Sequence, residues 1–313
     1  MELRQLRYVI AVAEERNLTR AAERLGLQPP PLSRQIKAIE REIDAQLFRR
    51  KPRGVELTDA GRAFLDNARA VLAQIDHALE TTRRTARGEQ GRISVGYSST
   101  VALHPLIARI IRAFREGLPR VAVTLSEGYP ENVIERMQDD QIDVAFIRRL
   151  LPGVEGIDLF RLHEEPMVAA LPAGHPLAQR VYRRGAALPL KALAGETFIL
   201  FGDPHGDALL RNNAFVTACQ AEGFTPRVGQ IVPHISSRLN LIAAGLGVAV
   251  VAASVQHLKM EGVTFCPLKG AAQLKQPLSL ASRRGDPSPV VRQFLKLAKR
   301  TAGDFRADDR HGR

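Results

Sequence analysis

The apolar positions between Asn17 and Gly61 follow two helical repeats and then a short alternation. The first repeat is Ala21, Ala22 and Leu25, and the second, spaced by fours and threes, is Leu32, Ile36, Ile39 and Ile43. Thr19 precedes the first repeat, and its hydroxyl can accept from a free N–H, so we expect it to cap that helix. Gly26 suits the left-handed residue that ends such a helix. The pattern predicts two short helices joined by a sharp turn.

The polar face of the second helix is basic, and a basic hairpin follows it. Ser33, Arg34, Lys37 and Arg41 share that face, whose cations can reach guanine acceptors or phosphates in a DNA major groove. On its own this helix is equally typical of a solvated amphipathic helix in any helical domain. The segment 47–57 adds an alternating strand pattern, a turn glycine and clustered cations, as in the wing of a winged helix-turn-helix.

Residues 1 to about 61 resemble the DNA-binding domain of LysR-type transcriptional regulators, and the order of later segments fits that family over nearly the whole chain. The matching residues are Leu6, Val12, Ala13, Leu18, Thr19, Ala21, Ala22, Leu25, Pro30, Leu32, Ser33, Ile36, Glu40, Leu47, Phe48, Arg49, Gly54, Leu57, Thr58 and Gly61. The resemblance implies double-stranded promoter DNA as a partner. The DNA-binding residues expected from it are Thr19, Gln28, Pro30, Ser33, Arg34, Lys37, Arg50 and Arg53.

Two positions depart from the family pattern. Pro29 stands where the family usually has a glutamine that touches a base, and Gln28 lies one position earlier. Ser33 and Arg34 are therefore better candidates than Gln28 for contact with a base. Asp44 replaces a glycine that the family favours, but Asp tolerates the left-handed conformation, so we expect the same fold.

A long helix should follow, capped by Thr58 and running to about Arg87. About 28 residues at ~1.5 Å each give a rod of roughly 42 Å. Its apolar seam is Ala60, Phe64, Ala68, Val71, Ile75, Ala78 and Leu79. Such a seam needs a partner, which is either its own domain or, as the resemblance implies, a second subunit. The segment 81–91 has lost the seam and is interpreted as a hinge.

From residue 92 onward, strand patterns alternate with helical patterns. Strands are expected at 92–97, 121–127, 142–147, 167–171, 197–200, 227–231, 248–251 and 278–282, and helices at 103–116, 131–138, 208–222, 235–244 and 289–301. This order predicts parallel α/β units with right-handed crossovers. Two such units joined by two crossings enclose a cleft, as in the periplasmic-binding-protein-like effector domain of the family.

The expected fold class is therefore α/β with three parts. An all-α winged helix-turn-helix spans residues 1–58, and a linker or dimerisation helix with its hinge spans residues 59–91. A two-subdomain α/β effector domain of periplasmic-binding-protein type II architecture spans residues 92–313. Subdomain I comprises about 92–162 and 269–313, and subdomain II comprises about 163–268.

Polar and aromatic residues follow the expected strands, where ligands bind in open α/β sheets. The candidate effector-binding residues are Ser98, Ser99, Thr100, Tyr129, Pro130, Arg148, Phe201, Gly202 and Val232. Hydroxyls at 98–100 and helix N–H groups could hold a carboxylate, although ordinary helix capping would explain one of them. Pro130 stands where the family often has Ser or Thr. The set favours a small organic acid as effector, aromatic and dicarboxylic acids included.

The composition and charge of the chain limit its expected location and partners. The 313 residues are 45% hydrophobic, carry a net charge of +12 and include two cysteines. The charge favours an anionic partner only in general terms, because it is not confined to the first sixty residues. No basic leader precedes an apolar run and no run approaches ~18 apolar residues, so we expect a cytoplasmic protein without a membrane partner. No Cys/His zinc spacing occurs, and we expect neither metal nor cofactor.

Three alternatives remain open beside the regulator. A transport-type solute-binding protein would share the cleft but requires export. Ser98, His104 and Asp143 could be imagined as a catalytic triad, but no Gly-x-Ser-x-Gly elbow is present. Cys219 and Cys266 could sense oxidants, although cysteines in such positions are more often buried structural thiols.

The resemblance also implies that the regulator acts as a homodimer or homotetramer (a dimer of dimers) on an inverted repeat, with RNA polymerase as a further candidate partner.

Overall fold

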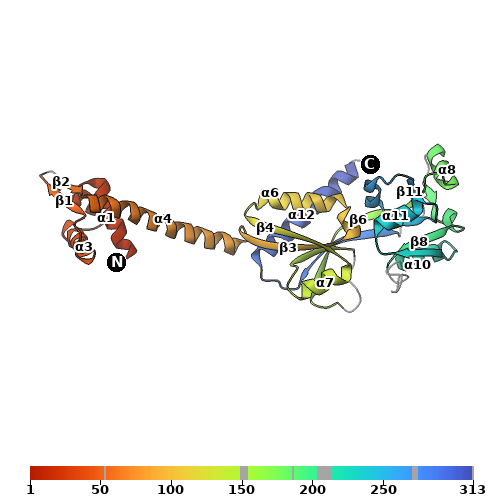
Figure 1. Cartoon of the computed structure of the whole chain (residues 1–313), viewed down its shortest axis with the longest axis horizontal. Coiled ribbons are helices and arrows are strands. Elements are labelled where there is room, and N and C mark those ends of the chain that lie inside the picture. The colour runs from red at the N-terminus through yellow and green to blue at the C-terminus, as the bar shows by residue number, and fades with distance from the viewer. Residues whose placement is uncertain (53, 149–153, 185–186, 203–212, 270–273, 312–313) are drawn as a thin grey trace. The chain divides into compact units, whose positions relative to one another are not determined.

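The computed structural model divides the chain into two compact units, Met1–Ala86 and Arg87–Arg313 (Figure 1). It describes residues 1–52, 54–148, 154–184, 187–202, 213–269 and 274–311. Arg53, one of the residues expected to contact DNA, lies outside the described residues, as does the 208–212 portion of one expected helix. No helix in the described ranges is both long and apolar enough to cross a bilayer.

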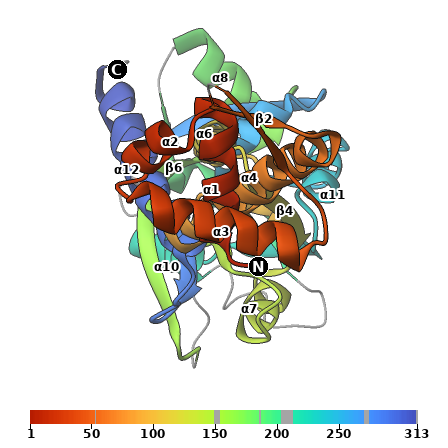
Figure 2. The same cartoon turned by 90° about the vertical axis from the view of Figure 1, so that its left-hand side faces the viewer.

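The N-terminal unit consists of three short helices, a hairpin and one long helix, which confirms the winged helix-turn-helix (Figure 2). Its elements are α1 (Leu3–Glu15), α2 (Leu18–Arg24), α3 (Pro29–Glu42), β1 (Phe48–Lys51), β2 (Gly54–Leu57) and α4 (Asp59–Arg87). The strands β1 and β2 pair antiparallel, with Phe48 opposite Leu57. The stripe expected on α3 faces the core, with Leu32, Ile36 and Ile39 buried among side chains of α1 and α2.

The cap of α2 differs from the expectation. Asn17 is the N-cap residue, and its side-chain oxygen accepts from the N–H groups of Thr19 and Arg20 at 2.9 and 3.2 Å. Thr19 therefore lies in the first turn rather than at the cap. Asn is at least as good a cap as Thr, and the left-handed Arg16 that ends α1 leaves only Asn17 in the extended conformation that a cap requires.

The hairpin packs tightly against the end of α1. The N–H of Val55 donates to the carbonyl oxygen of Arg16 at 2.9 Å. A Cβ at Gly54, whose φ is +142°, would lie 2.3 Å from that same oxygen, so only glycine allows this approach. Asp44 adopts the expected left-handed conformation at φ 51°, and its replacement of a glycine leaves the fold intact.

The helix α4 begins as expected, because the Thr58 hydroxyl accepts from the N–H of Gly61 at 2.9 Å. The start of the helix packs on the N-terminal unit, where Leu65 and Ala68 are buried. Further along, Val71 and Leu79 remain 44% and 50% exposed. The first part of the seam therefore packs on its own domain, and the later part has no partner within the described chain.

The second unit is an α/β structure built on one long path of strands. Its helices are α5 (Ser99–Ala102), α6 (Pro105–Gly117), α7 (Pro130–Gln138), α8 (Pro176–Arg184), α10 (Asn213–Ala221), α11 (Ile235–Ala243) and α12 (Pro289–His311). Its strands are β3 (Gly91–Ser98), β4 (Val121–Gly128), β5 (Val144–Ile147), β6 (Ile157–Pro172), β7 (Leu188–Pro189), β8 (Thr197–Phe201), β9 (Arg227–Val232), β10 (Ala249–Ala252), β11 (Val263–Lys269) and β12 (Lys275–Arg283). Short 3₁₀ helices occupy Leu190–Leu193 and Ala253–Leu258.

The strand order is β4-β3-β5-β12-β6-β11-β7, with β10 also paired to β6. The strands β4, β3 and β5 are parallel, and β12 returns to their sheet, both as expected from the sequence. The antiparallel pairing of β12 with β5 was not foreseen. In subdomain II, β8 and β9 are parallel. Helices α6 and α12 cover one face of the subdomain I sheet and α7 covers the other, each over its own core (Figure 1). These findings confirm the two-subdomain α/β expectation.

Several elements differ from those expected. The strand β6 is 16 residues long, pairing with β12 along 157–166 and with β10 and β11 along 167–172, whereas only 167–171 was expected. Its first half is largely exposed and charged, so it lacks the apolar run of its second half. The expected helix 103–116 is α6, which begins two residues later at Pro105, and a separate four-residue helix, α5, precedes it. The elements α8 and β7 were not foreseen.

His104 caps α6 from a buried position. Its Nδ1 accepts from the N–H of Leu106 at 3.2 Å, and its ring lies 5.2 Å from the ring of His163 and 5.7 Å from that of Phe305. Burial lowers the pKa of His104 to about 4. The neutral ring is therefore the form that the fold requires, because a protonated Nδ1 could no longer accept the capping hydrogen bond.

We predict that this histidine makes the protein lose stability between pH 6.5 and pH 4. The unfolded chain takes up a proton below about 6.5 while the folded chain does not until about 4, a linkage on the order of 3 kcal/mol. His104→Asn keeps a capping acceptor without titrating, so its melting temperature should fall less over this pH range than that of the wild type. The exposed His77→Asn is the matched control. Parallel melting curves for wild type and His104→Asn would contradict the assignment.

Candidate functional sites: a basic helix face and a cleft

The outer face of α3 carries the residues expected to contact DNA. Gln28 is the N-cap residue and makes no side-chain capping bond, and Pro30 lies exposed in the first turn. Arg34 and Lys37 are exposed one and two turns further along, while Ser33 is half-buried. Thr19 is exposed on α2 and Arg50 on β1. The structure thus leaves all seven described candidates at least partly open to solvent.

The cations on this face differ from their neighbours in having no counter-ion. Arg34, Lys37 and Arg50 donate no side-chain hydrogen bond and form no ion pair within the described residues. On α2, by contrast, Arg24 binds Glu14 at 2.8 Å and Arg20 binds Glu15 at 2.9 Å. Because ion-paired cations are already neutralised, Arg34, Lys37 and Arg50 are better placed than Arg20 and Arg24 to bind phosphate.

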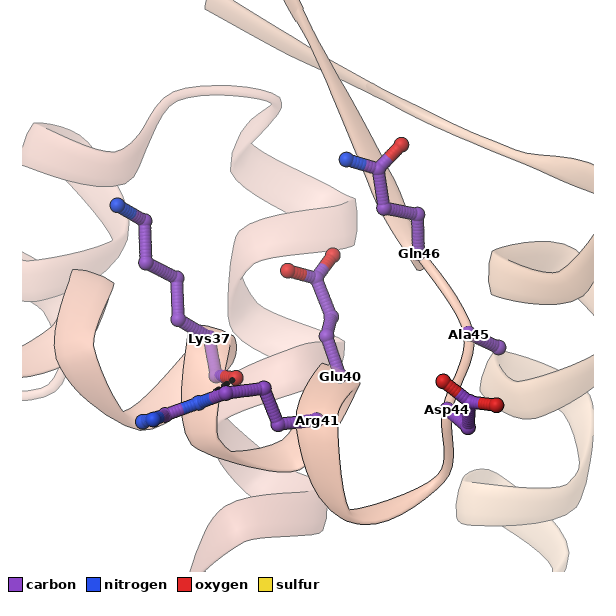
Figure 3. A pocket seen from close by; sticks show the side chains of 6 residues that line it. All are labelled: Lys37, Glu40, Arg41, Asp44, Ala45 and Gln46. Atoms are coloured by element: carbon purple, nitrogen blue, oxygen red, sulfur yellow. Dashed lines mark hydrogen bonds between the residues drawn. The ribbon is translucent and has the colours of Figure 1, made fainter.

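A shallow hollow at the end of α3 shows how this face is held (Figure 3). Glu40 turns toward the segment that leads into β1, where its carboxylate accepts from the N–H groups of Leu47 and Phe48 at 2.9 and 3.1 Å. Lys37 and Arg41 extend away on the other side, and Arg41 donates to the carbonyl oxygen of Lys37 at 3.2 Å. Glu40 therefore fixes the hairpin relative to α3 and leaves the cations free to face a ligand.

The second unit contains a cavity of about 220 Å³ between its two subdomains. Seven of the nine residues expected at an effector site line it, namely Ser98, Ser99, Thr100, Tyr129, Pro130, Arg148 and Phe201. Gly202 and Val232 do not line it. They lie just behind Phe201, where the Gly202 N–H donates to the Val232 carbonyl oxygen at 3.0 Å. Strand ends far apart in sequence thus converge on one cleft.

The hydroxyl-bearing turn after β3 has a different backbone from the one expected. Ser98 precedes α5, a helix of only four residues, so the turn has no long helix behind it. The Ser98 side chain makes no capping bond, and its Oγ is buried without a hydrogen-bond partner in the described residues. Ordinary capping therefore does not account for Ser98.

Arg148 fixes that turn from the side of subdomain I. Its guanidinium donates to the carbonyl oxygen of Thr100 at 3.0 Å and pairs with Glu165 at 2.5 Å. Both side chains are almost inaccessible, with exposed fractions of 13% and 4%. Burial lowers the pKa of Arg148, and Glu165 opposes that shift. Burial also opposes ionisation of Glu165, yet Arg148 and the N–H of Ser254 hold its pKa below the ordinary value.

Glu165 joins the two subdomains behind the cavity. It lies on β6, and its carboxylate accepts from the N–H of Ser254 at 2.8 Å and from the Ser254 hydroxyl at 3.2 Å. Ser254 follows β10 in subdomain II, whereas Arg148 follows β5 in subdomain I. One carboxylate is thus bound from both sides, and the back of the cleft is held by charge-assisted hydrogen bonds.

Sequence reasoning missed most of the wall that subdomain II provides. The additional lining residues from this subdomain include Met167, Ala214, Ile235, Arg238, Val250 and Val255, and Lys275 of subdomain I also lines the cavity. Arg238 did leave a signal in the sequence, because it falls in phase with the apolar positions Ile235 and Ile242 of α11. A cation inside an apolar helical stripe indicates a buried charge with a specific task.

The alternative chemistries find no support in the geometry. The Oγ of Ser98 makes no hydrogen bond to His104, and Asp143 is occupied by the N–H of Ser94 and by Arg283. The two thiols are buried, and burial raises the pKa of Cys219 to about 12 and also raises that of Cys266. Both are the inert thiol form rather than reactive thiolates at neutral pH.

Comparison with known proteins agrees with both halves of the structure. The family profile described as "Bacterial regulatory helix-turn-helix protein, lysR family" matches residues 3–62, and the one described as "LysR substrate binding domain" matches residues 86–303. The chain is 37% identical to the HTH-type transcriptional regulator BudR of Raoultella terrigena over 297 residues, which is 95% of this chain and 100% of that protein. It is 32% identical to the HTH-type transcriptional regulator AlsR of Bacillus subtilis over 298 residues, which is 95% of each chain.

Solved structures of LysR-type regulators also resemble this chain. Full-length CbnR complexed with its target DNA superimposes with a TM-score of 0.80 at 30% identity, covering 96% of this chain and 100% of that one. CbnR alone, described as a LysR family transcriptional regulator, gives a TM-score of 0.82 at 29% identity, covering 95% of this chain and 100% of that one. These relatives are regulators and not enzymes. The chain belongs to the LysR family of DNA-binding transcriptional regulators, with a helix-turn-helix domain and an effector-binding domain.

Proposed function

We propose that this regulator binds an inverted repeat in a promoter and that a small organic acid in the cleft changes how it binds. The observation that supports the acid most directly is the convergence of seven expected residues, with their hydroxyls and a guanidinium, on one cavity. Hydroxyls, cations and apolar walls together favour a carboxylate on a small organic body. Aromatic and dicarboxylic acids both belong to this class. No cofactor or metal takes part in the proposal.

We further propose that two chains pair through α4. The exposed Val71 and Leu79 lie on the apolar seam beyond its contact with the N-terminal domain, and an apolar stripe on a long helix is stabilised by a second helix. A homodimer brings two copies of α3 to one DNA site and so explains an inverted repeat. A homotetramer (a dimer of dimers), contact with RNA polymerase and a cytoplasmic location complete the proposal.

Arg34 should read the DNA sequence. Its exposed guanidinium on α3 can bind a guanine edge with two hydrogen bonds, so Arg34→Ala should cost about 1–3 kcal/mol at one base position of the operator. Gel-shift titrations against operators substituted one base pair at a time would measure it. An equal loss on every operator variant would show that Arg34 binds only phosphate.

Arg50 should add affinity without selectivity. It is an exposed cation on β1 with no ion pair among the described residues, so its expected partner is the phosphate backbone. Arg50→Ala should weaken binding to all operators alike and reduce the slope of log affinity against log salt by about one. Because Arg34→Ala removes the same charge, it is the matched control. A loss confined to one base position would place Arg50 in a groove instead.

The effector response should depend on the turn after β3. Ser99→Ala removes a hydroxyl from the cavity wall and leaves the N-terminal unit untouched. We expect unchanged operator affinity in gel shifts and a blunted change of transcription when candidate organic acids are added. Thr124→Ala, exposed on β4 outside the cavity, is the control. An undiminished response would remove Ser99 from the site, and failure of the wild type to bind any inverted repeat at low salt would contradict the proposed function itself.

A further inference from the structure

We propose that Arg238 is the counter-ion of the effector and that the cleft takes a small mono-anion, in its simplest form a monocarboxylate. This inference rests on the proposed function, in which the cavity between the subdomains is the effector site. It goes further by naming the residue that binds the charge and the number of charges that the ligand carries.

Arg238 lies in the cavity wall with much of its hydrogen-bonding capacity unused. It is buried, with 5% of its surface exposed, yet it lines the cavity. Its Nε donates to the carbonyl oxygen of Ile199 at 2.7 Å and its Nη2 to that of Val250 at 3.3 Å. A guanidinium has five N–H donors. Most of them therefore have no acceptor within the described part of the chain.

No carboxylate neutralises this charge among the described residues. The buried Arg148 has Glu165, but the partners of Arg238 are two carbonyl oxygens only. Burial lowers the pKa of Arg238 to about 9, which still leaves the group cationic at neutral pH. A buried ion without a counter-ion is strongly disfavoured, so an anion that enters the cavity would supply an interaction that the described side chains do not provide.

A second group points to a ligand from the facing subdomain. The buried Oγ of Ser98 has no hydrogen-bond partner in the described residues, and Ser98 is one of the residues that line the same cavity. Unsatisfied buried hydroxyls are rare in native proteins and call for a ligand or a water. Ser98 belongs to subdomain I and Arg238 to subdomain II. One ligand that satisfies both groups would therefore bind the two subdomains together.

The rest of the wall limits the ligand to one charge. Arg148 is already neutralised by Glu165, and Lys275 is exposed to water, where an ion pair gains little. Met167, Phe201 and Ile235 give the wall an apolar character. A second carboxylate would meet either this apolar surface or a cation that is already paired. The volume of about 220 Å³ lies below the range of about 300–1,000 Å³ typical of pockets for drug-sized ligands, so the anion is small.

The test uses the full-length protein and three sets of probes at constant ionic strength. The first set is acetate, propionate, butyrate and benzoate. The second is the four corresponding amides, which match them in shape without the charge, and the third is succinate and phthalate. Thermal melting and titration calorimetry would be run on the wild type, Arg238→Gln and Lys191→Gln. The last variant removes an exposed cation of subdomain II that does not line the cavity, and it is the matched control.

We expect at least one monocarboxylate to bind the wild type saturably, at least tenfold more tightly than its amide and than either dicarboxylate. Arg238→Gln should lose at least tenfold in affinity for that monocarboxylate, and Lys191→Gln should stay within about twofold. The inference is overturned if no monocarboxylate binds the wild type, if an amide or dicarboxylate binds as well, or if Arg238→Gln binds within twofold of the wild type.

Two further measurements keep the result decisive. If Arg238→Gln does not fold, Arg238→Lys takes its place, since it keeps the charge but loses the planar guanidinium. An intermediate affinity is then expected, and wild-type affinity contradicts the inference.

Gel shifts with promoter DNA separate this inference from the proposed function. If an anion binds through Arg238 without any effect on DNA binding or transcription, the anion site is supported and its regulatory role is rejected. If Arg238→Gln retains the full effector response, the regulatory role of the cleft is supported and the role of Arg238 as counter-ion is rejected.

Discussion

The geometry of the cleft depends on the buried ion pair between Arg148 and Glu165. Burying two charges is favourable only when each is neutralised and its remaining hydrogen bonds are made. Here Glu165 is also bound by Ser254, and Arg148 by the carbonyl oxygen of Thr100. The pair therefore does more than neutralise itself. It fixes the turn after β3, the end of β5 and the start of the segment after β10 around one carboxylate on β6.

Arg238 is a buried charge in the same cavity wall that no carboxylate neutralises among the described residues. Both arginines are buried in the wall of the same cavity, but only Arg148 has a carboxylate beside it. Replacing an unpaired buried cation by a neutral group would remove its desolvation penalty, so Arg238 costs the protein a free energy that a neutral side chain would avoid. A cost of this kind is a feature of binding sites, where a ligand supplies what the fold omits. The difference between two similar residues thus separates a structural charge from a ligand-binding one.

The DNA-binding half was predictable because its signals are local. The stripe on α3, the prolines in its first turn, the hairpin alternation and the left-handed Asp44 all depend on neighbours within about a turn or two. The error at Thr19 was also local, since two capping residues stand close together and the backbone of Arg16 decides between them.

The cleft was predictable only in part. Residues at strand ends, such as Ser98 and Phe201, were found because parallel α/β topology brings such ends together. Glu165 lies inside a charged, exposed-looking stretch of β6, and only its pairing with β12 in three dimensions reveals that it is buried. Partners at long sequence separation, such as Glu165 with Ser254, leave no periodic trace in a single sequence.

The placement of Ser98 and Arg238 on opposite subdomains also bears on how a ligand could act at a distance. A ligand shifts a conformational equilibrium only by its difference in affinity for the two states. Hydrogen bonds to a charged group contribute about 1.5–3 kcal/mol each, so two made only in the closed state would supply roughly 3–6 kcal/mol. Moving an equilibrium from 1:99 to 99:1 requires about 5.5 kcal/mol. One carboxylate bridging the two subdomains therefore reaches the energy of this switch at the upper end of its range, whereas two neutral hydrogen bonds, at about 0.5–1.5 kcal/mol each, do not.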